Sequence, residues 1–485
     1  MAIPIYSTAD IRRIESGAAN ETPPLMERAG LAAADLAAKL ASDRGKDILV
    51  LAGPGNNGGD ARIAARILEE RFFRVTIAGA SEASSLPDGK RWALVVDGLF
   101  GIGLTRDIAG DYATLAAYAN SQSCPVLALD LPSGLASDTG QVMGTAVRAT
   151  HTITFIAHKP GLLTLDGPDL CGEVTVADLG LDAAAHLPAS GWIADPGHFV
   201  DALRSRPRNF HKGNAGSVGV IGGSTGMVGA ALLAARAALR LGAGKVFVGL
   251  LDHHAPAFDP VALELMLRHP DDVLGFDLDA LVIGPGLGEG EHAETLLGAV
   301  LSSEIACVLD ADALNLLAAN SDLREACMRR RTATLITPHP AEAARLLGTN
   351  TREVQGDRLA AAQLLHERFK AHVVLKGNGS VLVATDGRWF INTSGNPGMA
   401  SAGMGDVLAG LLGAMLGQGL GGDAALVLGT HLHGIAADEC VAESLGPVGL
   451  TASEVAHRAR RVWNAWLRDQ AAGFQATLTR ALGSG

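Results

Sequence analysis

A glycine-rich segment in the C-terminal third of the chain ends on a carboxylate. Residues Asn396–Asp406 lead directly into an apolar stretch, from Val407 on, whose pattern is typical of a helix. Glycines let backbone N–H groups converge, and the positive end of the helix dipole lies beside them, so this segment can bind a phosphate without a cationic side chain. Asp406 would stand beside that phosphate, where it could remove a proton or hold Mg²⁺. Asp is also a common helix cap, and this motif alone does not decide between the two roles.

A second glycine-rich segment lies in the N-terminal half. Gly53–Asp60 follows an apolar run typical of a buried strand and precedes a predicted helix over Arg62–Arg71. This context resembles a phosphate-binding turn, although the segment is neither G-x-G-x-x-G nor a Walker A motif and lacks the Walker lysine and hydroxyl. Its paired asparagines, Asn56 and Asn57, offer amide oxygens and N–H donors together.

Two further strand-like runs in this half end on acids. Asp97 and Asp130 end them, and Ser133 follows shortly after Asp130. Ligands of parallel sheets bind at the carboxyl ends of the strands, so we expect these side chains to share one site. Asn57, Asp97 and Ser133 would supply only oxygen atoms, which suits a hard cation. Asp60 and Asp130 would remain for substrate binding or proton transfer.

The elements that position these residues fall into two α/β blocks. Apolar runs that alternate with helical patterns predict parallel sheets covered on both faces. A stretch rich in proline and arginine, residues 194–209, is the predicted linker, and the residues from Gly473 on are predicted to be an irregular tail. The predicted strands are Asp47–Ala52, Val75–Ala78, Ala93–Asp97, Val126–Asp130, His151–Ile156, Ser217–Gly223, Lys245–Gly249, Ala280–Ile283, Ile305–Leu309, Thr334–Ile336 and His372–Leu375, with a hairpin of Val381–Ala384 and Trp389–Ile391.

Length and composition narrow the class of protein. The 485 residues exceed what one hydrophobic core usually serves, which favours two domains. A net charge of −12 argues against nucleic acid or an anionic membrane as the main partner. The five cysteines are scattered and contain no C-x-x-C pair, which favours a reducing compartment. We find no signal-peptide pattern and no apolar stretch long enough to span a membrane, and we expect a cytoplasmic protein.

Three segments of the first block, Gly53–Asp60, Val96–Leu104 and Leu129–Leu135, together resemble the epimerase domain of NAD(P)H-hydrate repair proteins, over roughly residues 1–205. The resemblance implies a Rossmann-like domain in which the epimers of hydrated NAD(P)H interconvert. It implies that Asn57, Asp97 and Ser133 bind K⁺; because epimerisation needs proton transfer, Asp130 is our candidate general acid/base. The family commonly has glycine where this chain has Ala61, which affects the start of the helix. The implied substrate-binding residues are Asn56, Asn57, Gly58, Gly59, Asp60, Gly101, Ile102, Gly103, Leu104, Thr105, Arg106, Asp107 and Asp130.

The second block resembles the ADP-dependent dehydratase domain of the same repair system, a member of the ribokinase-like superfamily, over about residues 206–470. The resemblance implies a ribokinase-like α/β domain that uses ADP and Mg²⁺, with Asp406 as the catalytic base. The segments that carry it are His211–Gly216, Gly223–Ala230, Ile283–Gly288, Leu309–Asn315, Thr337–Glu342, Lys376–Ser380 and Asn396–Asp406. The implied nucleotide-binding residues are Lys376, Gly377, Asn378, Gly379, Ser380, Asn396, Gly403, Met404 and Gly405, and the implied substrate-binding residues are Ala230, Gly286, His339 and Asp406.

Together the two resemblances imply bifunctional repair, with domains over 1–205 and 206–485. The first domain would epimerise the R and S hydrates, and the second would dehydrate the S hydrate to NAD(P)H while ADP becomes AMP and phosphate. Two alternatives stay open: a ribokinase-like kinase of a small hydroxylated metabolite, and a nucleotide-binding regulatory protein without catalysis. The fused first domain disfavours the kinase, and Asp97, Asp130 and Asp406 disfavour the regulator. We expect small molecules as partners, neither nucleic acid nor membrane, and a homo-oligomer.

Overall fold

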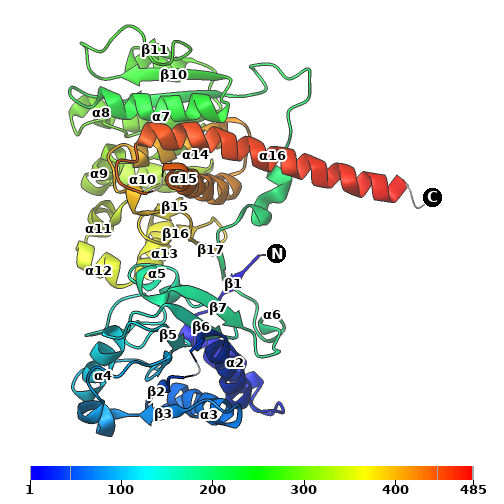
Figure 1. Ribbon diagram of the computed structural model, residues 1–485. Helices are drawn as coiled ribbons and strands as arrows, with labels where there is room; N and C mark the ends of the chain where they lie inside the picture. Colours follow the sequence, from blue (N-terminus) through cyan, green and yellow to red (C-terminus); the bar gives the residue numbers. More distant parts are fainter. Residues whose placement is uncertain (1, 44, 445, 483–485) are drawn as a thin grey trace. The chain divides into compact units, whose positions relative to one another are not determined.

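The computed structural model describes residues 2–43, 45–444 and 446–482, with side chains as far as residue 470. The chain forms two compact units, one of residues Ile3–Trp192 and a second from Ile193 onward. Figure 1 shows strands and helices alternating in both, so the predicted α/β class is confirmed. The division between the units falls ahead of the predicted domain boundary at residue 205.

The first unit contains a parallel sheet in the order β3-β2-β4-β5-β6-β7. Its strands are β2 (Ile48–Ala52), β3 (Val75–Ala78), β4 (Leu94–Gly98), β5 (Val126–Leu129), β6 (His151–Phe155) and β7 (Glu173–Ala177), and β1 (Pro4–Ile5) pairs with the first residues of β8 (Gly191–Ile193). Its helices are α1 (Thr8–Gly17), α2 (Leu25–Leu40), α3 (Asn56–Glu70), α4 (Asp111–Asn120), α5 (Gly167–Cys171) and α6 (Ala183–His186), with 3₁₀ turns η1 (Ala80–Ser85) and η2 (Pro160–Leu162).

Strand residues of the first sheet point alternately into two cores. Ile48 and Val50 of β2 pack with α2 and α3, whereas Leu49 and Leu51 pack with α4 and Trp92. Because both faces are covered, each central strand reads as a continuous apolar run, and this made β2, β4 and β5 predictable. Strand β7 was not predicted, since its side chains are partly exposed and its sequence carries no such run.

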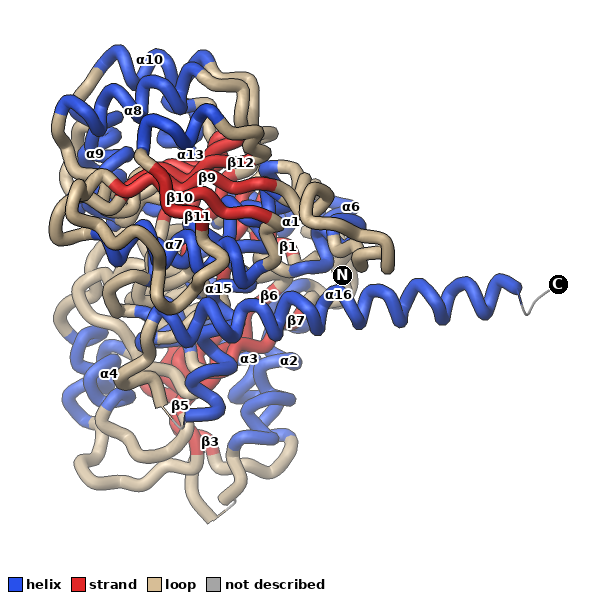
Figure 2. The backbone as a smooth tube through the Cα atoms, turned by 90° about the horizontal axis from the view of Figure 1, so that it is seen from above, coloured by secondary structure: helices blue, strands red, loops and turns tan. Residues whose placement is uncertain are grey.

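The second unit orders its strands β17-β16-β15-β14-β13-β12-β9-β10-β11. All pairs from β15 to β11 are parallel, and β16 and β17 add as an antiparallel pair beside β15. Figure 2 shows α7 on one side of β9 and β10 and α8 on the other. The strands are β9 (Ser217–Gly222), β10 (Lys245–Leu250), β11 (Met266–Arg268), β12 (Ala280–Ile283), β13 (Ala306–Leu309), β14 (Thr334–Ile336), β15 (His372–Leu375), β16 (Ser380–Val383) and β17 (Trp389–Asn392).

The helices of the second unit connect these strands and cover the sheet. They are α7 (Val228–Leu241), α8 (Glu291–Ser302), α9 (Asp312–Ala319), α10 (Ser321–Arg329), α11 (Pro340–Leu347), α12 (Thr351–Gly356), α13 (Arg358–Phe369), α14 (Met404–Gly417), α15 (Gly422–Ser444) and α16 (Ala452–Leu482), with 3₁₀ turns η3 (Pro196–Ala202), η4 (Pro270–Gly275) and η5 (Pro397–Met399). The tail predicted from Gly473 is helical as far as Leu482, the last residue of α16, and residues 483–485 lie outside the described residues.

Two helices begin earlier than predicted. Helix α3 starts at Asn56 rather than Arg62, and α14 starts at Met404 rather than Val407. In both cases glycines continue into the first turn, and their low helix propensity suggested a longer loop. Gly403 caps α14 with φ +87°, a left-handed conformation that glycine adopts without strain. Asp406 therefore lies within the first helical turn, beside free backbone N–H groups.

Cys171, Cys307 and Cys327 are buried, and burial raises the pKa of Cys171 and of Cys327 to about 12, so neither is a ready nucleophile. Among the described residues, no helix has both the length and the apolar character needed to cross a bilayer.

Candidate active sites

The strand order of the first unit reverses between β2 and β4. A ligand of such a sheet binds beyond the carboxyl ends of the strands at this reversal. The segment after β2 and Asp97 at the end of β4 both lie there. A β carbon built on Gly101 would be 3.1 Å from Asp130 Oδ2 and 3.4 Å from Asn57 Cγ. The structure thus brings Asn57, Gly101 and Asp130 together, while Gly103 and Thr105–Asp107 are exposed to solvent.

Asp130 follows β5 in the left-handed conformation, with φ +65°, which Asp tolerates better than most residues. Its Oδ1 accepts a hydrogen bond from Lys159 Nζ at 2.5 Å, and its Oδ2 lies 3.4 Å from the N–H donor of Ile102. Lys159 is fully buried and also donates to Thr154 Oγ1 and the Phe155 carbonyl oxygen. One carboxylate oxygen is therefore fixed by Lys159, and the other faces the predicted substrate loop.

Asp60 is a second buried acid in this site. Burial, followed by the negative charges of Asp130 and Glu15, raises the pKa of Asp60 to about 8. Asp60 therefore carries a proton at neutral pH, whereas the Lys159 ammonium stabilises negative charge on Asp130. A buried carboxyl group that keeps its proton beside a second carboxyl group is a common basis for acid–base catalysis.

The predicted cation ligands form a buried polar group. Ser133 Oγ donates to Asp97 Oδ1 at 2.6 Å, and Ser133 N donates to Asp97 Oδ2 at 2.8 Å. Burial raises the pKa of Asp97 to about 6, although the bonds from Ser133 act in the opposite direction. Both polar side-chain atoms of Asn57 are buried without a hydrogen-bond partner among the described residues, a costly state that a cation would relieve at the oxygen. These residues fit K⁺.

The strand order of the second unit reverses between β9 and β12. Gly286, just after β12, lies against the first turns of α7: a β carbon there would be 2.7 Å from Met227 Cβ and 3.4 Å from Ala230 Cβ. Ser224 N donates to the Gly286 carbonyl oxygen at 2.6 Å. The predicted substrate residues Ala230 and Gly286 therefore lie together at the reversal, where a ligand is expected.

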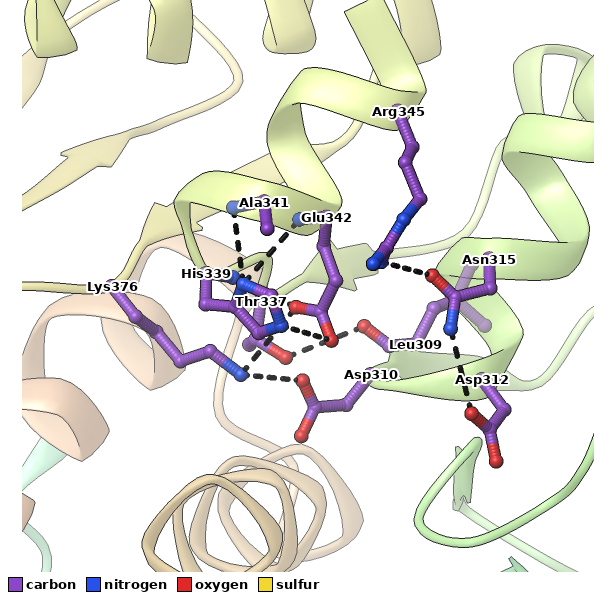
Figure 3. A network of polar contacts seen from close by, with 10 residues as sticks. All are labelled: Leu309, Asp310, Asp312, Asn315, Thr337, His339, Ala341, Glu342, Arg345 and Lys376. Atoms are coloured by element: carbon purple, nitrogen blue, oxygen red, sulfur yellow. Dashed lines mark hydrogen bonds and ion pairs between the residues drawn. The ribbon is translucent and has the colours of Figure 1, made fainter. Parts of the chain in front are cut away.

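A network of charged side chains occupies the ends of β13, β14 and β15 (Figure 3). Lys376 Nζ donates to the buried Asp310 Oδ1 at 2.8 Å and lies 3.9 Å from Glu342 Oε2. Burial by itself lowers the pKa of Lys376, but attraction to Asp310 and Glu342 outweighs it and the pKa is raised. Lys376 thus remains a cation in a site that it shares with two acids.

His339 is oriented by the backbone of α11. Its Nδ1 accepts a hydrogen bond from Ala341 N at 3.1 Å, and its Nε2 lies 3.2 Å from Glu342 Oε1. Burial, and then the positive charges of Lys376 and Arg345, lower the pKa of His339. The imidazole is therefore neutral at physiological pH, with its proton on Nε2.

The end of the glycine-rich segment, in the first turn of α14, lies against this network. A β carbon on Gly405 would be 3.2 Å from Lys376 Nζ and 3.5 Å from Asp310 Oδ2. Burial, and then the charges of Asp310 and Asp312, raise the pKa of Asp406 to about 6, while Lys376 acts in the opposite direction. Asp406 is thus a stronger base than an ordinary Asp and is still mostly ionised at pH 7.

Side chains fix the shape of the two predicted nucleotide loops. In Lys376–Ser380, Ser380 Oγ donates to the Gly377 carbonyl oxygen, and the buried Arg358 donates to the Leu375 carbonyl oxygen beneath the loop. In the loop of Asn396, its Oδ1 accepts from Gly398 N, and its Nδ2 donates to Asp438 Oδ1. The side chains of Asn396 and Ser380 thus each stabilise the shape of the loop in which they lie.

Four residues of these sites were absent from the predicted site residues: Lys159, Asp310, Glu342 and Arg358. Asp310 and Glu342 stand within motifs that the sequence analysis quotes, directly after β13 and in the first turn of α11, and their position was the available signal. Nothing in the sequence distinguishes Lys159 or Arg358 from a solvated surface cation, because their burial depends on tertiary packing.

Known proteins resemble both units. A family model described as NAD(P)H-hydrate dehydratase matches residues 218–459, and one described as YjeF-related protein N-terminus matches residues 23–94 and 79–161. The bifunctional NAD(P)H-hydrate repair enzyme Nnr of Coxiella burnetii is 39% identical, over 93% of this chain and 97% of that protein. The enzyme of the same name from Escherichia coli is 37% identical, over 96% and 95%.

A solved structure resembles the second unit. It is the ADP/ATP-dependent NAD(P)H-hydrate dehydratase from Bacillus subtilis co-crystallized with ATP/Mg²⁺, with a TM-score of 0.51 and 30% identity. The match covers 56% of this chain and 98% of that one. This likeness confirms the predicted ribokinase-like fold, and the parallel sheet of the first unit, with its order reversal, is Rossmann-like as predicted.

Proposed function

The chain belongs to the family of bifunctional NAD(P)H-hydrate repair enzymes, with an epimerase and a dehydratase domain, and we propose that it repairs hydrated NADH and NADPH by both reactions. The R and S hydrates interconvert in the first domain, and the second dehydrates the S hydrate as ADP becomes AMP and phosphate. The observation that carries the proposal is that each sheet has, at the carboxyl ends of its strands, an acid of raised pKa: the buried Asp60 near Asp130 in the first, and the partly buried Asp406 in the second.

In the epimerase site, the hydroxyl at C6 of the hydrate stands beside the ring nitrogen, so the epimers interconvert through loss and readdition of water or through ring opening. Either route needs a proton donor and a proton acceptor. We assign Asp130, with Oδ2 facing Ile102 and its charge stabilised by Lys159, as the acceptor. Asp60, protonated at neutral pH, is the donor.

We propose that K⁺ binds Asn57, Asp97 and Ser133 and neutralises the buried Asp97. Replacing K⁺ by Li⁺, which is much smaller, should lower both the rate of epimer exchange and the melting temperature of the first unit, because Asn57 and Asp97 then lose a matched partner. Calorimetry with each ion measures the stability. The Ser133→Ala variant should lose this ion dependence, and an ion-independent melting temperature in the wild type would contradict the assignment.

In the dehydratase site, we propose that Asp406 removes the proton of the C6 hydroxyl as that oxygen attacks the terminal phosphate of ADP. The backbone N–H groups of residues 403–405 and the Lys376 ammonium stabilise the transferred phosphoryl group. The C6–O bond then breaks as the ring nitrogen lone pair forms a C6–N double bond and phosphate leaves, and loss of a proton from C5 turns this iminium into the C5–C6 double bond. One water is thereby removed as phosphate, and NAD(P)H is restored.

We propose that Mg²⁺ enters with the nucleotide. Among the described residues, no group of three or more His, Cys, Asp or Glu is arranged as a metal site. Mg²⁺ commonly takes one or two carboxylates and completes its shell with phosphate oxygens and water. Asp310 and Glu342 are the acids beside the predicted phosphate position, and the Bacillus relative was crystallised with ATP and Mg²⁺.

The function is tested with both epimers of hydrated NADH, Mg²⁺ and either ADP or ATP, by following the return of NADH absorbance. We expect complete recovery from the mixture with ADP, because the R hydrate is drained through the S hydrate. Omitting the nucleotide should stop recovery while exchange of the epimers continues. No recovery with either nucleotide would overturn the proposal and favour a kinase of another small molecule.

We further propose a cytoplasmic, homo-oligomeric protein. All five cysteines are free in the structure, which supports a reducing compartment. Cell fractionation tests the location, and sedimentation of the purified chain tests the assembly.

A further inference from the structure

The second unit contains a large cavity that the proposed reactions do not use. Its volume is about 1560 Å³, above the usual range for small-molecule sites. It is lined by η3, the end of α7, the loop after α14 and the middle of α16, and no predicted nucleotide or substrate residue is among its lining residues. Helix α7 begins beside the dehydratase site, and its residues from Arg236 on line the cavity, about 12 Å along the helix axis from Val228.

Arginine dominates the charge of this cavity. Six arginines line it, against the two carboxylates Asp201 and Glu264. The chain as a whole has a net charge of −12, so a cationic cavity is a local exception. The lining arginines are Arg204, Arg206, Arg236, Arg240, Arg460 and Arg468.

Most of this charge lacks a protein counter-ion. Arg236 forms a two-bond ion pair with the buried Asp259, with both N–O distances at 2.6 Å. Across the described part of the chain, no carboxylate lies within ion-pair distance of Arg204, Arg206, Arg240 or Arg460. The sequence after Asp469 contains no further acid. The positive charge must therefore be balanced by solvent ions or by a ligand.

Basic side chains crowd together here. Arg240 Nη1 lies 2.5 Å from His457 Nδ1. Besides burial, the positive charges of Arg236 and Arg460 lower the pKa of Arg240 while Glu264 acts in the opposite direction, and the charges of Arg240 and Arg460 lower the pKa of His457. Arg206 has a structural role that explains it, since it donates to the Gly242 carbonyl oxygen and to Gln418 Oε1. Arg240 likewise has His457 as a hydrogen-bond partner, whereas the Arg460 guanidinium has neither an ion pair nor a hydrogen bond among the described residues.

Apolar side chains form the rest of the wall. Leu239 and Leu241 of α7, Phe210, and Trp463 and Leu467 of α16 line the same cavity. Guanidinium groups bind phosphate through paired hydrogen bonds, and the aromatic and aliphatic groups suit an uncharged part of the same ligand. We propose that this cavity is a second, non-catalytic binding site for a small molecule that carries several phosphates and an aromatic or aliphatic group.

The test uses inorganic tripolyphosphate as the probe and the full chain. Because the dehydratase loops also attract phosphate, the Lys376→Met variant serves as the background, and binding is followed by calorimetry and by the fluorescence of Trp463. We expect saturable binding in this background and at least a tenfold rise in Kd when Arg240→Gln and Arg460→Gln are added. The control is Arg461→Gln: Arg461 is an exposed residue of the same helix that lies near Glu443 outside the cavity, and its loss should leave Kd unchanged.

Any of the following results would contradict the proposed binding site. The proposal is wrong if the Lys376→Met variant does not bind tripolyphosphate, or if adding Arg240→Gln and Arg460→Gln leaves Kd unchanged. It is also wrong if sedimentation shows that the cavity joins two copies of the chain, so that the arginine variant dissociates an oligomer and no phosphate binds. Should the double variant fail to fold, Arg204→Gln with Arg468→Gln, both exposed, provides the same measurement. On an otherwise wild-type chain, the double variant should keep its dehydration rate at saturating ADP within twofold, which separates this inference from the proposed function.

Discussion

Replacing Asp406 by Asn is expected to abolish ADP-dependent dehydration of the S hydrate and to leave epimer exchange at its normal rate. The amide cannot accept the proton of the C6 hydroxyl, and losing a general base typically slows a reaction by about 10²–10⁴-fold. The two reactions depend on separate units, so one should fail without the other. NADH absorbance measures dehydration, and chromatography of the R and S hydrates measures exchange. Dehydration at the normal rate in this variant would remove Asp406 from its role.

The pH dependence of the dehydration rate provides a second test of Asp406. The base must be ionised, and its pKa is about 6, so the dehydration rate should fall as the pH drops below about 6. Asp312 is one of the acids that raise this pKa. Asp312→Asn should therefore shift the acid limb of the rate profile to lower pH. An acid limb that stays in place would mean that another group controls it.

Replacing Lys159 by Met is expected to impair both the stability and the activity of the epimerase domain. Asp130 would keep a mostly buried charge without its closest donor, and breaking a buried ion pair in this way typically costs about 3–5 kcal/mol. Exchange of the epimers should be lost, because Asp130 is no longer held with Oδ2 toward Ile102. Denaturant unfolding measures the first effect and exchange of the R and S hydrates the second, and dehydration of pure S hydrate should persist.

A double variant separates the chemistry from the folding. In Lys159→Met with Asp130→Asn both charges are removed, so much of the stability should return while exchange stays absent. Asp130→Asn alone should also lack exchange, since the amide is not a base. If Lys159→Met exchanged the epimers at the normal rate, the ion pair would be only structural and the assigned acceptor would need revision.

The elements and the acids at their ends were largely predictable from the sequence. Strands covered on both faces read as continuous apolar runs, and the acids stand near the ends of elements: Asp97 near the end of β4, Asp130 directly after β5 and Asp406 in the first turn of α14. The predictions that failed concern short segments. Strand β11 was not predicted because it has only three residues, and glycines made the first turns of α3 and α14 read as loops. Ala61, the departure from the family pattern, is fully buried within α3, so helix formation does not need a glycine there.

The sequence did not predict which cationic side chains contact the catalytic acids. Lys159 contacts Asp130 across 29 positions of the chain, and Lys376 contacts Asp310 across 66. Which cation is buried against which acid depends on how loops return over a sheet, and neither composition nor periodicity records that. Raised pKa values follow from the same packing, so Asp60 could be recognised as an acid but not as a protonated one.

The left-handed backbone of Asp130 has a practical consequence. At φ +65° the side chains that fit without strain are few, and Asn is the closest of them in shape. Asn therefore keeps the turn, although on its own it leaves the buried Lys159 without its counter-ion, whereas valine or alanine would disturb the turn as well as the chemistry. A chain carrying Asn at this position together with Lys159→Met should hold the hydrated nucleotide in the first unit without converting it there, and would serve as a bait with which to capture and identify these damaged coenzymes from cell extracts.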